Sequence, residues 1–212
     1  MPSRLLWGRI KALFYKPIRG DRDMELLQQR ILSDGKVLPG GILKVDNFLN
    51  HQIDPALLYE MAKELQRLYA GEQITKVLTI EASGIAIATM VGYVLGCPLV
   101  FAKKSKSRNI SNNVYSVEVE SFTHGNTNTV VLSKEYLGPS DRVLIVDDFL
   151  ATGAALVGLK ALAEQAGATV VGAGIAIEKA FQGGGEALRR QGLRIESLAR
   201  IAAMSDDSLS FC

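Results

Sequence analysis

Two adjacent carboxylates, Asp147 and Asp148, are the residues best suited to do chemistry. They come at the end of a hydrophobic run, residues 143–146, and a turn of small residues follows them at 151–155. This turn opens a helical pattern, so its unpaired backbone N–H groups and the helix dipole suit a monophosphate. The carboxylates would repel that phosphate, so we expect them to face sugar hydroxyls. The segment therefore predicts a site for ribose carrying a 5′-phosphate.

An ordinary structural role is the alternative for this segment. Paired acids before a glycine turn also cap helices. The unbroken order of a hydrophobic strand, two acids and the turn Ala-Thr-Gly favours the ligand site instead. The chain contains neither GxxxxGK[ST] nor GxGxxG, which argues against P-loop kinases and dinucleotide enzymes.

Alternating strand and helix patterns surround this motif. Strands are expected at residues 76–80, 99–102, 141–146 and 169–177, and helices at 85–95 and 155–166. A further helix begins where Asp54 precedes Pro55, because the carboxylate caps the first turn and proline suits it. This alternation predicts an α/β fold in which helices cover both faces of a mostly parallel sheet. Ligands in such sheets bind beyond the carboxyl ends of the strands, where Asp147 and Asp148 stand.

The middle of the chain departs from this alternation. Residues 103–113 are polar and basic, and we expect them to form a long loop. Residues 115–121 and 128–132 then alternate like an antiparallel pair. The loop's cations, Lys103, Lys104, Lys106 and Arg108, are either solvated or carried by a mobile lid over a polyanion.

Composition narrows the class of protein. The chain has 212 residues, 48% hydrophobic and 22% charged, with a net charge of +2. It is therefore not a disordered chain, and its charge gives no reason to expect nucleic acid or an anionic membrane as a partner. Cys97 and Cys212 fit neither a disulfide scaffold nor a zinc site, so we expect a reducing cytoplasm. We expect residues 1–23 to be a basic, poorly ordered extension and 24–212 to be one domain, with Met24 a plausible alternative start.

Residues 143–155 resemble the phosphoribosyl pyrophosphate (PRPP) binding motif of the type I phosphoribosyltransferases. From residue 24 onward the chain resembles the bacterial xanthine-specific branch of that family, in the stretches 43–55, 79–86, 100–107, 177–182 and 196–201. The resemblance implies a parallel sheet flanked by helices, with a small hood and a flexible lid hairpin. It also implies transfer of the phosphoribosyl group of PRPP to xanthine in purine salvage, giving xanthosine 5′-monophosphate (XMP) and pyrophosphate. A homodimer is implied as well, as is Mg²⁺ carried mainly by PRPP and pyrophosphate, so no metal ligands are assigned to the chain.

The same resemblance implies roles for individual residues. Asp147 and Asp148 would bind the ribose hydroxyls, and one of them could assist proton transfer at the purine. The residues that would bind PRPP are Ala151, Thr152, Gly153, Ala154 and Ala155 at the 5′-phosphate, Glu81, Ala82, Ser83 and Gly84 at the pyrophosphate, and the lid cations Lys103 and Lys104. Those that would contact xanthine are Leu43, Asn50 and Lys179.

Several of these residues also have structural interpretations. Glu81 suits a helix N-terminus as an acid, Lys179 could be a surface lysine, and Leu43 could be core. Phe181 either stacks on the purine or packs in the core. The turn ends in Ala154 and Ala155, where many family members have Gly followed by Thr or Ser. We interpret this departure as a feature of the xanthine branch.

Two other functions remain open at this point. One is phosphoribosyl transfer to adenine, guanine or hypoxanthine. The other is a regulatory protein that senses PRPP on the same fold, as Gram-positive purine repressors do. Residues 1–23 are too short for a folded DNA-binding module, and the overall charge lacks a basic footprint, which argues against the sensor.

Overall fold

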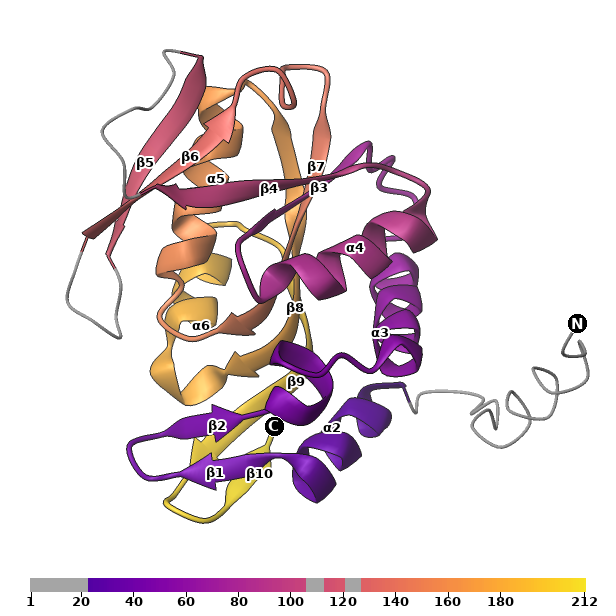
Figure 1. Ribbon diagram of the computed structural model, residues 1–212, viewed down its shortest axis with the longest axis vertical. Coiled ribbons are helices and arrows are strands. Elements are labelled where there is room, and N and C mark those ends of the chain that lie inside the picture. Colours follow the sequence, from indigo (N-terminus) through magenta and orange to yellow (C-terminus); the bar gives the residue numbers. More distant parts are fainter. Residues whose placement is uncertain (1–22, 106–112, 121–126) are drawn as a thin grey trace, which may run out of the picture.

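The computed structural model describes residues 23–105, 113–120 and 127–212. Within them, one sheet has the strand order β10-β9-β8-β7-β3-β4-β6-β5 (Figure 1). The neighbours from β9 to β4 run parallel, whereas β10, β6 and β5 are antiparallel additions at the two ends. The strands are β3 (Lys76–Ile80), β4 (Leu99–Ser105), β5 (Val114–Glu120), β6 (Thr127–Ser133), β7 (Arg142–Leu150), β8 (Thr169–Lys179), β9 (Ile195–Met204) and β10 (Leu209–Phe211). The predicted α/β fold and the predicted antiparallel pair are both confirmed.

Helices cover both faces of this sheet. On one face lie α2 (Asp23–Asp34), α3 (Pro55–Leu68) and α4 (Gly84–Leu95), whose apolar side chains form one core with those of Leu144 and Val146. On the other face, α5 (Ala154–Gln165) and α6 (Gly184–Arg190) form a second core with Val143 and Ile145. Alternate residues of β7 thus enter opposite cores, as the two-residue period of a strand requires. No helix of the described ranges has the length and apolar character needed to cross a membrane.

The predicted start of α3 is confirmed by its contacts. Asp54 Oδ1 accepts hydrogen bonds from the backbone N–H groups of Ala56, at 3.1 Å, and Leu57, at 3.2 Å. These bonds satisfy two donors that a helix start leaves without an intrahelical partner.

A small unit that the hydrophobic pattern did not predict precedes α3. It comprises β1 (Lys36–Leu38), β2 (Ile42–Lys44) and a short π-helix, η1 (Asp46–Asn50). The two strands pair with each other and form a sheet separate from the large one. A 3₁₀ turn, η2 (Ala180–Gln182), follows β8. We call β1, β2 and η1 the hood.

Two predicted boundaries were wrong. Strand β7 does not end before the two acids but runs through them to Leu150, because its pairing with β8 continues to Glu178. Strand β4 continues to Ser105, so Lys103 and Lys104 belong to a strand and not to the predicted loop. The antiparallel partner β6 supplies backbone hydrogen bonds there, and this pairing overrides the polar composition of the segment. Lys106 and Arg108 lie outside the described residues.

Candidate active site

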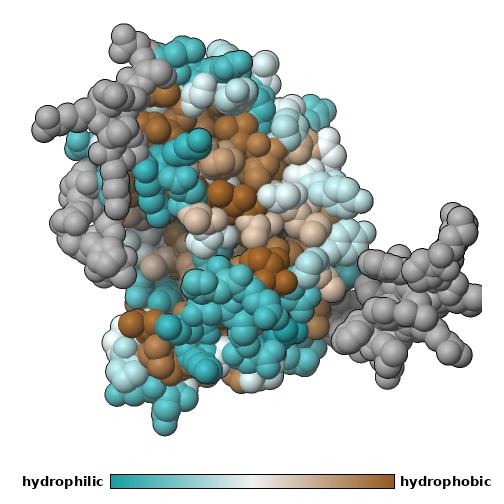
Figure 2. Space-filling view, viewed as in Figure 1, coloured by the Kyte–Doolittle hydropathy of each residue, from teal (hydrophilic) through white to brown (hydrophobic). Residues whose placement is uncertain are grey.

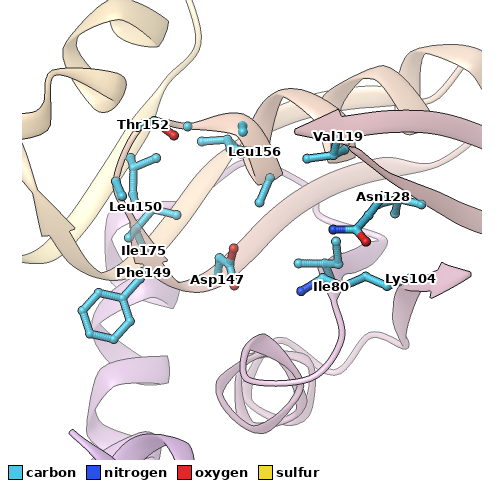
Figure 3. A pocket seen from close by; sticks show the side chains of 15 residues that line it. Ile80, Lys104, Val119, Asn128, Asp147, Phe149, Leu150, Thr152, Leu156 and Ile175 are labelled. Atoms are coloured by element: carbon cyan, nitrogen blue, oxygen red, sulfur yellow. The ribbon is translucent and has the colours of Figure 1, made fainter. Parts of the chain in front are cut away.

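The topology creates a crevice between β3 and β7. From β3 the chain crosses to β4 on one side, and from β7 it crosses to β8 and β9 on the other. A crevice opens at the carboxyl ends of the strands at such a switch point, and this is where ligands bind in parallel sheets. A cavity of about 210 Å³ lies there (Figure 3). Its walls comprise Ile80, Lys104, Val119, Asn128, Val130, Asp147, Phe149, Leu150, the turn 151–155, Leu156 and Ile175.

The turn 151–155 forms one end of the cavity and leads directly into α5. Gly153 has φ +91°, a conformation that favours glycine, and precedes the first helical residue, Ala154. No side chain of the described residues caps this helix start. The first N–H groups of α5 are therefore available to a ligand, and the small side chains of the turn let an anion come close.

The two acids lie behind this turn, each only 6% exposed. Asp147 Oδ1 accepts the backbone N–H of Asp148 at 3.0 Å, and Ser83 Oγ donates to Asp148 Oδ1 at 2.9 Å. Burial, and after it the charge of Asp148, raises the pKa of Asp147 well above its ordinary value, while the positive charge of Lys104 acts in the opposite direction. Asp147 lines the cavity.

The turn 81–84 joins the acids to β4. Glu81 Oε1 accepts the backbone N–H of Lys104 at 2.7 Å, and the peptide bond between Glu81 and Ala82 is cis. Gly84 is packed so closely that a Cβ atom there would lie 2.8 Å from Asp147 Oδ1 and overlap Thr79 Oγ1. The Glu81 carboxylate thus holds β4 in place, which favours the structural interpretation of that side chain and leaves the backbone of the turn for an anion.

Only one of the two predicted lid cations reaches the cavity. Lys104 lines it together with Val130, its partner across the strand pair. Lys103 points to the other face, as the alternation of a strand requires, and its ammonium lies 5.7 Å from the centroid of the Phe101 ring.

The residues expected at the purine lie where β8 ends and in the hood. Lys179 Nζ donates to the carbonyl oxygen of Gly41 at 2.8 Å and lies 5.7 Å from the centroid of the Phe149 ring. Burial lowers the pKa of Lys179. Leu43, 7% exposed, belongs to β2, and the buried Oδ1 atom of Asn50 has no hydrogen-bond partner among the described residues. An orphaned buried oxygen is rare in a protein and points to a missing ligand or water.

A buried ion cluster fixes the backbone next to Lys179. Glu178, 1% exposed, accepts two hydrogen bonds of 2.7 Å from Arg189 and one of 2.6 Å from Ser197. Burial alone would raise the pKa of Glu178, but these hydrogen bonds and the charges of Arg189 and Arg200 outweigh it, so the pKa is lowered. The end of β8 is therefore held rigidly.

Sequence reasoning did not name several residues of the cavity wall, among them Phe149 and Asn128. Phe149 lies inside the motif that drew attention to the acids, and it approaches Lys179, whereas Phe181 is 43% exposed and does not line the cavity. Asn128 is a polar residue on the face of β6 whose other residues, Val130 and Leu132, are buried and apolar. Which face of β6 is buried follows only from the strand pairing, so the sequence alone did not single out Asn128.

No group of three or more His, Cys, Asp or Glu side chains that could hold a metal ion occurs in the described ranges. Asp147 and Asp148 are adjacent, and of the two only Asp147 lines the cavity.

Comparisons with known proteins agree with this geometry. Residues 44–186 match the family model described as the phosphoribosyl transferase domain. A xanthine phosphoribosyltransferase of Bacillus cereus is 53% identical over 188 residues, which cover 89% of this chain and 95% of that protein. Another of that name, from Bacillus cytotoxicus, is 54% identical with the same coverage.

Solved structures extend the likeness to the fold. The adenine phosphoribosyltransferase of Thermoanaerobacter pseudethanolicus is 23% identical, has a TM-score of 0.68, and the match covers 84% of this chain and 99% of that one. The APRTase from Giardia lamblia complexed with 9-deazaadenine is 26% identical, has a TM-score of 0.71, and the match covers 82% and 97% of the two chains.

Proposed function

This chain belongs to the phosphoribosyl transferase domain family, and on that premise we propose that it transfers the phosphoribosyl group of PRPP to xanthine, giving XMP and pyrophosphate in purine salvage. The observation that carries the proposal is the cavity that joins an uncapped helix start, a buried carboxylate and a lysine at the switch point of the sheet. Relatives named for the xanthine reaction, at 53% and 54% identity, support the choice of base.

We assign each part of PRPP to polar groups that line this cavity or lie beside it. The turn 151–155 would bind the 5′-phosphate, and Asp147 and Asp148 the ribose hydroxyls. The backbone of the turn 81–84 and the ammonium of Lys104 would bind the diphosphate. Holding both reactants in line is the main contribution that such an enzyme makes, because the leaving group is already good.

One of the acids also has a role at the purine. Xanthine loses a ring proton when it gains the ribosyl group, and a carboxylate of raised pKa accepts a proton more readily than an ordinary one. We assign this proton to Asp147, whose pKa is raised by burial and by Asp148. Ser83, which donates to Asp148, keeps the neighbouring carboxylate oriented toward the sugar.

The residues present suit Mg²⁺ that arrives with the substrate. Among the described residues the carboxylates of Asp147 and Asp148 have no third ligand group beside them, so a hard cation there would take most of its oxygens from PRPP and water. When bound, Mg²⁺ would neutralise charge on the diphosphate. Chelation should abolish turnover and weaken PRPP binding, and added Mg²⁺ should restore both.

Xanthine would bind among Leu43, Asn50 and Lys179. The Lys179 ammonium, now bonded to the Gly41 carbonyl, would donate to a carbonyl oxygen of the base, and the unpartnered Asn50 Oδ1 would accept from a ring N–H. A site of this kind discriminates strongly, because an analogue without those groups leaves buried polar atoms unpaired.

The test is Lys179→Met, compared with Lys44→Met, an exposed lysine of β2. Loss of a hydrogen bond from a charged donor costs about 1.5–3 kcal/mol, so kcat/KM for xanthine should fall about tenfold to 150-fold while KM for PRPP stays unchanged. The kcat/KM for hypoxanthine, which has one carbonyl fewer, should fall less. Equal losses for Lys179→Met and Lys44→Met would contradict the assignment.

We also propose a cytoplasmic homodimer. The two cysteines are free, which suits a reducing compartment. Tyr93 on α4 is 77% exposed and Phe101 on β4 is 38% exposed, and Figure 2 shows hydrophobic residues gathered around these elements. Such a surface suits an interface between copies. Light scattering should give twice the monomer mass, and Tyr93→Glu should shift the mass toward the monomer.

A further inference from the structure

One wall of the cavity is built by the antiparallel pair β5–β6, and a single polar side chain stands in it. Of the described residues that this pair contributes to the lining, Val119 and Val130 are apolar and Asn128 is polar. Val119 is the partner of Asn128 across the pair, and Val130 follows it by two residues, so all three share one face. Figure 3 shows the amide of Asn128 and the ammonium of Lys104 both reaching toward Asp147.

An amide at this position needs an explanation. Asn is disfavoured in strands, and a valine would suit the apolar neighbours better. Asn128 is half-buried and lines the cavity, so its amide is placed to bind a ligand there.

We propose that Asn128 is a substrate-contacting residue whose side-chain amide donates a hydrogen bond to the diphosphate of PRPP. This inference rests on the proposed function. Asn128 lies on the Lys104 side of Asp147, away from the turn that would bind the 5′-phosphate (Figure 3). The diphosphate has only acceptor oxygens, and the amide N–H₂ adds directed donors beside the cation without further charge.

Contacts between α5 and β5 hold this wall in place. A Cβ atom at Gly158 would overlap Val119 Cγ2, so the valine fills a notch that only glycine leaves open. Gln165 Nε2 donates to the carbonyl oxygen of Ser116 at 2.9 Å, and its Oε1 accepts the Ser116 N–H at 3.3 Å. Because α5 begins at the phosphate turn, these contacts between α5 and β5 set the distance between Asn128 and the 5′-phosphate site. Gly158 is thus a positioning residue.

The first test compares Asn128→Ala and Asn128→Asp in the full chain, with Thr129→Ala on the opposite face of β6 as the matched control. Loss of the hydrogen bond should raise KM for PRPP and the calorimetric Kd of Mg²⁺-pyrophosphate about tenfold, with kcat and KM for xanthine within about twofold. The carboxylate of Asn128→Asp should weaken both further by repulsion. Thr129→Ala should match the unsubstituted chain.

The second test alters the contact between Gly158 and Val119. Gly158→Ala should raise KM for PRPP, because the added methyl displaces Val119, and Val119→Ala in the same chain should restore it by removing the methyl that it meets. A merely structural glycine would lower stability without this rescue of KM.

Two outcomes would overturn the proposal. One is an unchanged KM for PRPP and an unchanged pyrophosphate Kd in Asn128→Ala. The other is tighter binding by Asn128→Asp than by Asn128→Ala, which would place sugar hydroxyls, as donors, against this side chain. Failure of the unsubstituted chain to use PRPP would instead refute the proposed function itself. The unsubstituted chain is therefore assayed with PRPP before the variants.

Discussion

Gly84→Ala tests whether the turn 81–84 and Asp147 form one unit. Gly84 is the first residue of α4, and a Cβ atom there would lie 2.8 Å from Asp147 Oδ1 and overlap Thr79 Oγ1. Real Cβ atoms essentially never come within 3.0 Å of another heavy atom, so both side chains must move. Both are buried, Thr79 completely and Asp147 with 6% exposed, which leaves them little room.

Two opposing effects determine how much Gly84→Ala changes the free energy of unfolding. Alanine in place of glycine inside a helix gains up to about 1 kcal/mol from helix propensity. An added methyl in a packed interior costs about 1–3 kcal/mol. We expect a net loss of about 1–2 kcal/mol in the free energy of unfolding. Turnover should fall more steeply, by about 100-fold, because Asp147 would be displaced from its position against the sugar.

Urea unfolding and steady-state kinetics measure the two effects separately. Gly138→Ala is the control, since a Cβ atom there meets nothing within 4 Å. Adding Thr79→Ala to Gly84→Ala removes the worse overlap, so stability should recover while turnover stays low, because the contact with Asp147 remains. Wild-type stability and full turnover in Gly84→Ala would show that the turn 81–84 and Asp147 do not form one unit.

Three further predictions concern charge and chain boundaries. A raised pKa means that folded Asp147 binds its proton more tightly than the unfolded chain does, so stability falls as pH rises from about 3.9 to the folded pKa. Asp147→Asn should therefore raise Tm at neutral pH while lowering turnover about 100-fold or more. A lower Tm would contradict the raised pKa of Asp147. Arg189→Ala leaves the buried Glu178 without its main partner, so urea unfolding should show a loss of about 3 kcal/mol; a loss below about 1 kcal/mol would mean that Arg200 and Ser197 suffice. Removing residues 1–22 should leave turnover and solubility unchanged, and a drop in either would assign that segment to the domain.

Local patterns were enough to predict much of this fold. Residues 76–80 were expected as a strand and form β3 with the same bounds, because a run of branched residues flanked by polar ones has few alternatives. The Asp54 cap and the turn 151–155 could likewise be predicted from the sequence, since both depend on neighbours within a few residues.

Long-range pairing accounts for what sequence reasoning missed. The strand character of Lys103 and Lys104 depends on β6, and the three-residue strands of the hood are too short for any periodicity. Lys179 meets Gly41 across 138 residues, and Asn128 faces Asp147 only because β6 pairs with β4 and β5. Such contacts are properties of the tertiary fold, which a single sequence does not display.

The most direct measurement is pyrophosphate release from PRPP and Mg²⁺, with xanthine, guanine, hypoxanthine and adenine offered separately. We expect turnover with xanthine as the preferred base. Preference for another purine would contradict the assignment of Asn50 and Lys179 while leaving the PRPP site intact. PRPP binding without turnover of any base would contradict the proposed phosphoribosyl transfer and favour a PRPP sensor on the same fold.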